Sequence, residues 1–490
     1  MKIKYLSAED RKNLRLLRHS TDMNEKIAIM ESIFRRPFYT LQALWEYRKF
    51  YMELSEERLK EHPALVCGLA HIYSMHGDID KAQETLSLFP IGSRYYLMTK
   101  MTMFYTKQQE VLQISKKLQE NRWKFRNITL TAGRPSVING LWDMTPYTDD
   151  LLRGQEETFA SIEHLFEEQV KYIHELMVAE TMYWRDDCYT ALVKAVSVIP
   201  FFREQQDMRL LFAAMALEIY ILVLNGQVIT TAPLIENLRH QIRYKEVEEY
   251  LPNIDALEAR MAMYDGDYTK ITRWMREDAP DEYSRFCMLD IYRYMVKMRV
   301  YIVQGRYLAV TSLASRLLPI LENGNRFMDM CELHIIWSMS DFADGRKEEA
   351  LDHIEKALVL AERYRYDRLI ADEGYRVLEI LRYYRKTRGQ GKIDSYLERV
   401  ISLSDKTSAM HPGYLKGQLP NNPALTDTEM RVLRLLAELK TNGEISEITG
   451  MAEETAKKHC KHIFAKLEVK NRHQAVQKAV EVGLIEPKRF

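Results

Sequence analysis

Glycine and proline are scarce in this sequence. Its 490 residues contain 19 glycines and 14 prolines, together about 7% of the chain where an average protein has about 12%. Both residue types mark turns, so a chain with few of them has few turns for its length. We therefore expect long helices joined by short connections.

The sequence also lacks an excess of charge of either sign. Lys and Arg number 70, as do Asp and Glu, which excludes a uniformly basic surface that would coat nucleic acid. A DNA-binding surface must then be a local basic patch. Hydrophobic residues are 46% and charged residues 29% of the chain, a balance typical of folded globular proteins.

Clustered cysteines and long apolar runs are missing as well. The five cysteines are dispersed, with no C-x-x-C pair and no His/Cys spacing typical of zinc, so we expect free thiols in a reducing compartment and no bound metal. The first residues contain no apolar segment of a signal peptide. The most apolar stretch, residues 210–224, is interrupted by Glu218 and is shorter than a bilayer span of about 20 residues. These absences predict a cytoplasmic protein with no membrane contact.

Catalytic motifs are missing too. The sequence has no H-E-x-x-H, no G-x-S-x-G and no nucleotide-binding glycine loop. We therefore predict that the protein is not an enzyme, has no catalytic residues and needs no cofactor.

A repeat of about 40 residues is the strongest large-scale feature that is present. Glycine followed by a polar residue recurs at positions 226, 266, 305 and 345, at spacings of 40, 39 and 40. Apolar residues recur at helical three- and four-residue steps on both sides of these glycines, which predicts two helices per repeat. A glycine between them permits the left-handed geometry that ends a helix. One hairpin cannot bury its apolar face alone, so such hairpins stack into a superhelical solenoid.

An earlier copy of this unit, around Gly77, resembles a tetratricopeptide (TPR) repeat, with a glycine turn and an apolar second helix. At residues 183–187 the turn position is filled without glycine. We predict an all-α fold, with a helical segment over 1–60 and a TPR-like helical-hairpin solenoid over 61–400.

Two segments interrupt the helical pattern. Residues 127–150 contain two glycines and two prolines, which exclude one continuous helix. We expect a long loop or small hairpin against the solenoid, either functional or simply a solvent-exposed insertion. Residues 401–424 include three prolines and two glycines and are predicted to be a linker.

The last 66 residues, 425–490, have a different organisation. Thr441 and Glu444 form a capping box that opens a short helix, and Gly450 follows as a turn residue. A longer helix is predicted from about residue 453 to 467, and a fourth after Arg472. Two short helices joined by a tight turn predict a helix-turn-helix within a four-helix domain.

The third of these helices has a cationic face. From residue 455 to 472, six Lys and Arg stand against one acid, a net +5 in a chain whose total is zero. On a helical wheel, one side is apolar, while the far side carries Lys458, Lys461, His462 and the small Ala465. Such a face can enter the major groove and donate to base acceptors and phosphates. An ordinary solvated lysine face is the alternative.

This segment resembles the LuxR/GerE-type helix-turn-helix family, without gaps from Leu425 to about Val476. The matching residues include Leu425, Glu429, Val432, Leu433, Asn442, Glu444, Ile445, Thr455, Lys457, His459, Ile463, Lys466, Leu467, Val469 and Arg472. Three departures are Leu439, where the family usually has Gly, Thr449 at an apolar position, and Ala452, where the family has a Ser cap.

The resemblance implies a DNA interface and a dimer. It implies that Lys457, Lys458 and Lys461 face bases. On the helical wheel His462 lies on the far side and His459 on a flank, so both are further candidates for DNA contact. The resemblance places Thr441, Asn442, Thr455 and Lys466 near phosphates. The fourth helix is expected to dimerise through Val476, Ala479 and Val480.

Residues of about 55–400 resemble the TPR-like sensor region of MalT-type LuxR regulators. Those regulators usually carry a P-loop ATPase, but no G-x-x-x-x-G-K-[ST] occurs here, so nucleotide switching is not expected. The effector of the solenoid is left open between a small molecule, such as a sugar, and a peptide or protein. A candidate ligand groove comprises Arg134, Tyr292, Arg293, Arg299, Tyr364 and Arg368. The alternative is that these are amphipathic packing residues with exposed tips.

We therefore predict a transcription regulator whose solenoid senses an effector and whose C-terminal domain binds double-stranded DNA as a homodimer, with RNA polymerase as a possible further partner. The alternative function is a TPR scaffold or adaptor whose helix-turn-helix binds protein.

Overall fold

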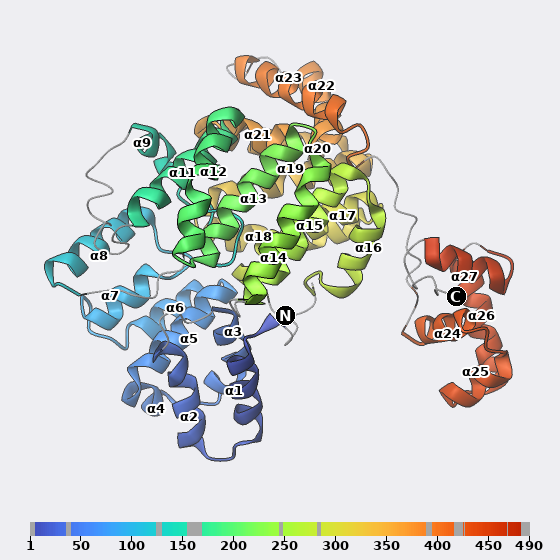
Figure 1. Cartoon of the computed structure of the whole chain (residues 1–490), viewed down its shortest axis with the longest axis horizontal. Coiled ribbons are helices and arrows are strands. Elements are labelled where there is room, and N and C mark those ends of the chain that lie inside the picture. The colour runs from blue at the N-terminus through green and yellow to red at the C-terminus, as the bar shows by residue number, and fades with distance from the viewer. Residues whose placement is uncertain are drawn as a thin grey trace.

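The computed structural model describes residues 5–35, 41–123, 130–153, 169–244, 248–281, 286–388, 394–415, 425, 427–467 and 469–481. The described residues form helices and connecting loops, with no strand among them (Figure 1). The prediction of an all-α fold is confirmed. No helix in these ranges is both long and apolar enough to cross a bilayer.

The chain begins with four helices that pack onto the first repeat. They are α1 (Ala8–His19), α2 (Met23–Ser32), α3 (Leu41–Tyr51) and α4 (Glu56–Glu61). Ser7 caps α1, because its hydroxyl oxygen accepts from the amide of Asp10. Leu14, Leu17 and Tyr47 are buried in the same hydrophobic cluster as the solenoid, so these helices extend the solenoid at its N-terminal end.

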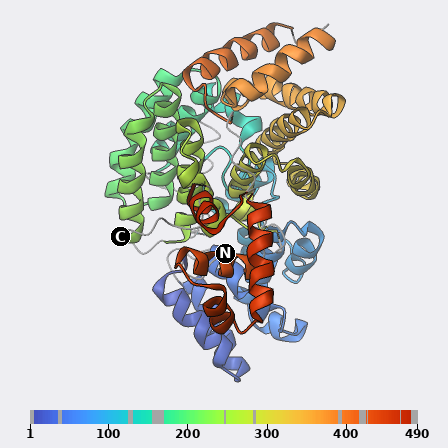
Figure 2. The same ribbon diagram turned by 90° about the vertical axis from the view of Figure 1, so that its right-hand side faces the viewer.

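The solenoid itself is a succession of paired helices. Its helices are α5 (Pro63–His76), α6 (Ile79–Leu86), α7 (Arg94–Met101), α8 (Gln108–Glu120), α9 (Thr148–Arg153), α11 (Val170–Trp184), α12 (Cys188–Glu204), α13 (Met208–Leu224), α14 (Thr231–Tyr244), α15 (Leu251–Asp265), α16 (Tyr268–Glu277), α17 (Ile291–Val303), α18 (Tyr307–Asn323), α19 (Phe327–Ala343), α20 (Lys347–Tyr364), α21 (Asp367–Ala371), α22 (Gly374–Thr387) and α23 (Asp394–Met410). Neighbours such as α5 and α6, α11 and α12, and α19 and α20 pack as hairpins. Figure 2 shows these pairs following a curved path.

The repeating turns have the geometry that the glycine spacing predicts. Gly226, Gly266, Gly305 and Gly345 all have positive φ, between 67° and 84°, a conformation that glycine adopts without steric cost. At the turn without glycine, Asp186 takes the same conformation with φ of 71°. The polar residue after the turn also has a role: Asp267 caps α16, because its carboxylate accepts from the amide of Lys270.

The segment predicted as an insertion at 127–150 is an internal loop in its described part, residues 130–150. Thr131, Ile138 and Leu141 are fully buried, so the alternative of a solvent-exposed insertion is wrong for these residues. The indole of Trp142 donates to the carbonyl of Met101 at 2.8 Å. A side chain at Gly140 would lie 2.0 Å from the carbonyl oxygen of Leu130, so only glycine fits there.

Ion pairs and hydrogen bonds fix this loop to distant helices. Arg134 donates to Asp329 of α19 at 2.9 Å, and the amide of Val137 donates to Glu180 of α11 at 2.9 Å. Asn253 of α15 donates to the carbonyl of Gly133. The loop therefore joins three helices that are far apart in the sequence.

The solenoid ends later than the sequence pattern predicts. Helix α23 continues to Met410, so the predicted linker start at residue 401 is wrong. Val400, Ser404 and Thr407 are buried on one side of this helix. Their spacing of three and four residues shows that the helical pattern of burial continues into the polar segment after residue 400. Residues 416–424 of the predicted linker lie outside the described residues.

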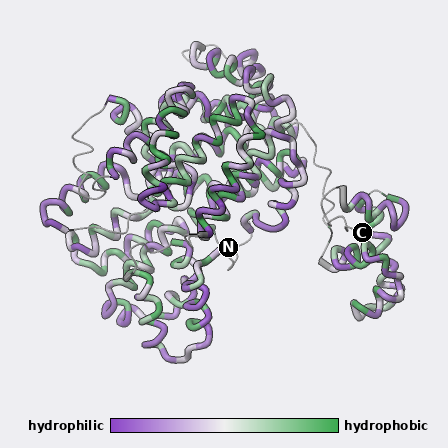
Figure 3. The backbone as a smooth tube through the Cα atoms, viewed as in Figure 1, coloured by the Kyte–Doolittle hydropathy of each residue, from purple (hydrophilic) through white to green (hydrophobic). Residues whose placement is uncertain are grey.

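The C-terminal domain has a separate core. Its helices are α24 (Asp427–Ala437), α25 (Asn442–Thr449), α26 (Glu453–Lys466) and α27 (Arg472–Glu481). Their apolar residues form a cluster distinct from that of the solenoid. Figure 3 shows hydrophobic and hydrophilic residues alternating along the helices of both parts, the pattern of amphipathic helices with one buried side.

Candidate nucleic-acid interface and interior cavity

Helices α25 and α26 form the predicted helix-turn-helix. Thr441 and Glu444 make the capping box at the start of α25, with each side chain bonded to the backbone of the other. Gly450 ends α25 in the left-handed conformation, with φ of 72°. The turn then leads to α26, whose cap position is Ala452, with no side-chain hydrogen bond to the first amides.

The faces of α26 divide as the helical wheel predicts. The buried side consists of Ala456, Cys460, Ile463 and Leu467. The exposed side carries Thr455, Lys457, Lys458, Lys461, His462 and Ala465. Lys457 lies 3.8 Å from Glu454 in an exposed pair, which costs little to break. A row of cations thus faces solvent along one helix, opposite its core side.

Two residues predicted to contact phosphate have partners within the domain. Nζ of Lys466 lies 2.6 Å from Oε2 of Glu429, whose side chain is only 4% exposed. The side-chain oxygen of Asn442 accepts from Arg472 at 3.0 Å. These groups hold α24, α25 and α27 around α26, so their structural role is evident from the geometry.

His459 lies half-buried beside this ion pair. Glu429, His459 and His462 bring one potential ligand atom each within 4.8 Å of one another, a donor set that suits a transition metal. The ammonium of Lys466, however, already neutralises Glu429, and a metal cation would be repelled by it. We assign no metal to this cluster.

The fourth helix differs from its expected role at one position. Ala479 is fully buried in the core of its own domain, as is Ala475. Ala479 therefore offers no surface to a partner, and its prediction as a dimerisation residue is wrong. Val476 packs at the edge of the core and stays partly exposed. The side chain of Val480 lies outside the described residues.

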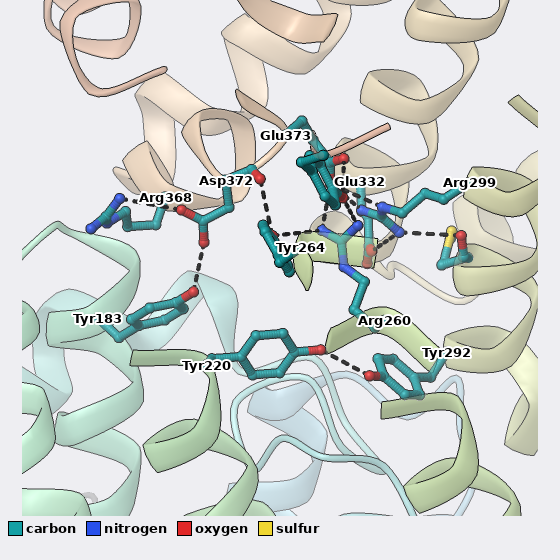
Figure 4. Close-up of polar contacts among 12 residues, drawn as sticks. Tyr183, Tyr220, Arg260, Tyr264, Tyr292, Arg299, Glu332, Arg368, Asp372 and Glu373 are labelled. Carbon is teal, nitrogen blue, oxygen red and sulfur yellow. Dashed lines mark hydrogen bonds and ion pairs between the residues drawn. The ribbon is translucent and has the colours of Figure 1, made fainter. Parts of the chain in front are cut away.

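The solenoid contains a polar cavity of about 70 Å³ between α11, α13, α15, α17, α19 and the start of α22. Figure 4 shows tyrosine, arginine and carboxylate side chains that gather there. Its wall includes Arg134, Tyr183, Trp184, Tyr220, Arg260, Tyr264, Tyr292, Arg299, Glu332, Asp372 and Glu373. The paired side chains therefore fill most of this space and leave little free volume between them.

Charges in this cavity are paired. Arg260 and Arg299 both donate to Oε1 of Glu373, at 2.8 and 2.9 Å, and Arg299 also lies 2.7 Å from Glu332. Burial opposes ionisation of Glu373, but the two arginines hold the pKa of its carboxyl below the ordinary value. The hydroxyls of Tyr220 and Tyr292 lie 2.8 Å apart.

Asp372 occupies a less favourable environment. Burial raises the pKa of its carboxyl to about 6, against the opposing effects of Arg368 and the hydroxyl of Tyr183. Tyr183 donates to Oδ2 of Asp372 at 2.6 Å, and Arg368 donates to Oδ1 at 3.3 Å. The cavity therefore contains a carboxyl that titrates just below neutral pH.

Comparisons with known proteins place both parts of the chain. The family model of bacterial regulatory proteins, luxR family, matches residues 423–479, and that of the MalT-like TPR region matches residues 154–387. The spore germination protein GerE of Bacillus subtilis is 35% identical over 69 residues, which are 14% of this chain and 93% of that protein. The chain belongs to the LuxR family.

Other relatives match over shorter shares of their length. The response regulator protein VraR of Staphylococcus epidermidis is 31% identical over 111 residues, 19% of this chain and 53% of that protein. The transcriptional activator protein AhyR of Aeromonas hydrophila is 41% identical over 64 residues, 13% of this chain and 25% of that protein. The matched part of the chain thus spans about half the length of these staphylococcal proteins.

The structure brings together only some of the residues that were predicted to form a ligand groove. Arg134, Tyr292 and Arg299 line the cavity. Arg293 instead pairs with Asp290 at 2.6 Å. The remaining two, Tyr364 and Arg368, lie outside the cavity wall: Tyr364 packs on Phe327, and Arg368 pairs with Asp186.

Sequence reasoning missed the residues at the centre of the cavity. Arg260 and Glu332 each stand between apolar residues in their helices, whereas Glu373 lies between Asp372 and Gly374 just before α22. All three take part in the buried ion pairs. A charge inside an apolar helical run is the signal that could have found Arg260 and Glu332, but no such local signal marks Glu373. The alternative of packing residues with exposed tips is wrong for Arg299, whose side chain is 2% exposed.

Proposed function

We propose that this protein is a transcription regulator that binds double-stranded DNA through α26 and responds to an effector in its solenoid. The observation that carries the proposal is the exposed cationic side of α26, directly opposite the buried side that fixes the helix in the domain. A helix held in this way by a preceding helix and a tight turn presents its free side to the major groove.

The exposed residues have distinct roles in this proposal. Lys458 and Lys461 donate to base acceptors such as the O6 and N7 atoms of guanine. The exposed hydroxyls of Thr441 and Thr455, near the starts of α25 and α26, contact phosphates, which are also attracted to helix N-termini. Lys457 and His462 extend the contact on either side.

Two copies are proposed to bind one DNA site, because one small domain reads few base pairs. Contact through α27 is supported by the partial exposure of Val476. We propose that the DNA-bound dimer acts on RNA polymerase, and that the protein works in the cytoplasm.

The cavity in the solenoid supports a small molecule as the effector over a peptide. Its volume of about 70 Å³, between side chains that are paired with one another, is too small for an extended chain. The competing proposal, a scaffold that binds protein through α26, remains the alternative.

The test uses the full-length protein and DNA selected from a random pool. Binding is titrated against the selected DNA and random DNA at several salt concentrations. A DNA-binding regulator loses affinity steeply as salt rises, with a slope of about −0.9 for each phosphate contact. The Lys458→Ala/Lys461→Ala variant should lose most of the preference for selected DNA, whereas Lys12→Ala, an exposed lysine of α1, should not.

Failure to enrich any DNA sequence, together with a flat salt response, would favour the scaffold alternative. Light scattering of the complex gives the number of protein chains for each DNA. One chain on the best selected site would contradict the proposed dimer without affecting DNA binding itself.

A further inference from the structure

Tyr414, just beyond the last solenoid helix, is bound inside the protein. Its side chain is fully buried, and its hydroxyl donates to Oε2 of Glu373 at 2.9 Å while accepting from the guanidinium of Arg260. Its ring stacks on that of Tyr264, with centroids 4.2 Å apart and planes 10° from parallel. One tyrosine therefore satisfies a donor, an acceptor and an aromatic face.

The residues around Tyr414 are fixed with it. The ring of His411 meets the carbonyl of Val223 at 2.9 Å through Nε2, which must carry the proton because a carbonyl only accepts. Arg376 donates to the carbonyl of Leu415 at 2.9 Å, and Leu415 is 1% exposed. Residues 411–415 are thus bound to the solenoid immediately before the segment that leads to α24.

The partners of Tyr414 are also walls of the polar cavity. Arg260, Tyr264 and Glu373 line it, and Glu373 accepts from both arginines on one oxygen and from Tyr414 on the other. A change of partner on one side of this carboxylate therefore alters the bonds that hold Tyr414 on the other side. The cavity and the start of the interdomain connection share one hydrogen-bond network.

We propose that Tyr414 is an internal occupant of the effector site, and that a small phenolic effector takes its place and releases residues 411–415. This inference rests on the proposed function of the solenoid as an effector-binding region. The chemistry of the effector follows from what the site already holds: a flat ring with a neutral hydroxyl that accepts from an arginine and donates to a carboxylate.

Other ligand classes fit this site less well. A carboxylate in place of the hydroxyl would face Glu373, and an ammonium would face Arg260, so each meets a like charge in a buried site. An aliphatic alcohol supplies the hydroxyl but not the flat face that stacks on Tyr264. A phenol supplies both.

Release of residues 411–415 lengthens the connection between the solenoid and the C-terminal domain. Five residues in extended form add up to about 17 Å of reach. For two domains that must occupy paired half-sites, the reach of the connection sets the effective concentration of the second domain. The phenolic effector is therefore expected to change affinity for a two-site DNA more than for a single half-site.

The first test measures binding of p-cresol, the isolated tyrosine side chain, to the full-length Tyr414→Ala protein by calorimetry. Removal of the side chain leaves a ring-shaped space with its polar partners in place. We expect p-cresol to bind this variant at least about tenfold more tightly than it binds wild type, in which Tyr414 competes. Toluene and 4-methylcyclohexanol, which lack the hydroxyl or the flat ring, should bind the variant at least about tenfold more weakly than p-cresol.

The second test measures release by hydrogen exchange in the peptide that contains residues 405–415. The amide of His411 bonds to Thr407 and that of Tyr414 to His411, so their exchange reports on this segment. Saturating p-cresol should raise exchange there in wild type, and at lower concentration in Tyr414→Phe, which keeps the ring and loses the hydroxyl.

Two results would overturn the proposal. Equal affinity of the Tyr414→Ala protein for p-cresol and toluene would show that the site does not recognise a phenol. Unchanged exchange in both wild type and Tyr414→Phe at saturating p-cresol would show that no release occurs. Neither measurement uses DNA, so a failure here is distinct from a failure of the proposed DNA binding.

Discussion

The ammonium of Lys466 lies 2.6 Å from the carboxylate of Glu429 and joins the last turn of α26 to the first turn of α24. The carboxylate is buried, while the lysine remains 37% exposed. The LuxR resemblance implies a phosphate contact for this lysine. The geometry shows that its charge also neutralises a buried acid.

Lys466→Ala should therefore destabilise the C-terminal domain. The variant leaves a buried carboxylate without its cation, at a cost of about 1–3 kcal/mol. Hydrogen exchange of the amides in α24 and α26 measures this free energy of opening in the full chain. The Lys466→Ala/Glu429→Gln double variant should recover part of the loss. A variant of unchanged stability whose salt slope falls by about one unit would instead indicate a phosphate contact alone.

Lys461→Ala should weaken and broaden DNA recognition. Lys461 is exposed on the side of α26 opposite Cys460 and Ile463, so its removal leaves the core intact. A lost base contact costs about 1–3 kcal/mol on the preferred sequence and less on random DNA. Titration of both DNAs at matched salt gives the two values. Equal losses on both DNAs would contradict base reading by this residue.

Ala452→Ser should stabilise α26. Ala452 has the extended backbone of a cap residue, with φ of −64° and ψ of 145°, but no side-chain oxygen for the amides that follow. A serine there should add about 0.5–2 kcal/mol to the free energy of opening. Ala465→Ser, an exposed position inside the same helix, is the control and should slightly destabilise it. If both serines had the same effect, the helix would not begin where the structure places it.

Leu439→Gly should also stabilise the C-terminal domain. Leu439 has φ of 59°, a left-handed conformation that costs a non-glycine residue about 1–2 kcal/mol. Its side chain is 74% exposed, so little packing is lost on truncation. We expect a gain of about 1 kcal/mol, reduced by the added freedom of glycine in the unfolded chain. Leu439→Ala keeps the strain, and a gain of equal size for alanine would argue against this explanation.

Asp372→Asn should change how stability depends on pH. The folded carboxyl has a pKa of about 6, above the unfolded value of about 3.9, so the folded state binds more protons between these values. That contribution to stability is complete below about pH 4 and is lost as the pH rises through about 6. Asn cannot ionise, so the variant should gain up to about 3 kcal/mol relative to wild type between pH 4 and pH 7. Denaturant midpoints at several pH values measure this difference, and a pH-independent difference would exclude the shifted carboxyl as its cause.

Local patterns in the sequence were sufficient for the repeats and for α26. Gly266 and Asp267 together specify a turn and the cap that follows it, and the spacing of Cys460, Ile463 and Leu467 defines a buried side. Each of these features depends on residues within one or two helical turns. Such information is contained in a single sequence.

Long-range partners could not be predicted in the same way. Asp329 bonds to Arg134 across 195 residues, and Glu373 to Arg260 across 113. Nothing in the spacing of these residues relates them, because their approach depends on the curvature of the whole solenoid. The end of α23 is hard to predict for a related reason. Its last turns are largely polar, like a linker, and only the long-range partners that bury one side identify them as part of a packed helix.

The internal loop alters the mechanics of the solenoid. In an ordinary stack of repeats each unit contacts only its neighbours. Such a stack is flexible along its length, and its terminal repeats can unfold one at a time. Here residues 130–143 connect α11 to α19 through bonds to Glu180 and Asp329. Arg134 is itself buried, so its guanidinium would lose its ion pair if this connection broke. The repeats from α11 to α19 are therefore expected to move together and to unfold as one cooperative unit.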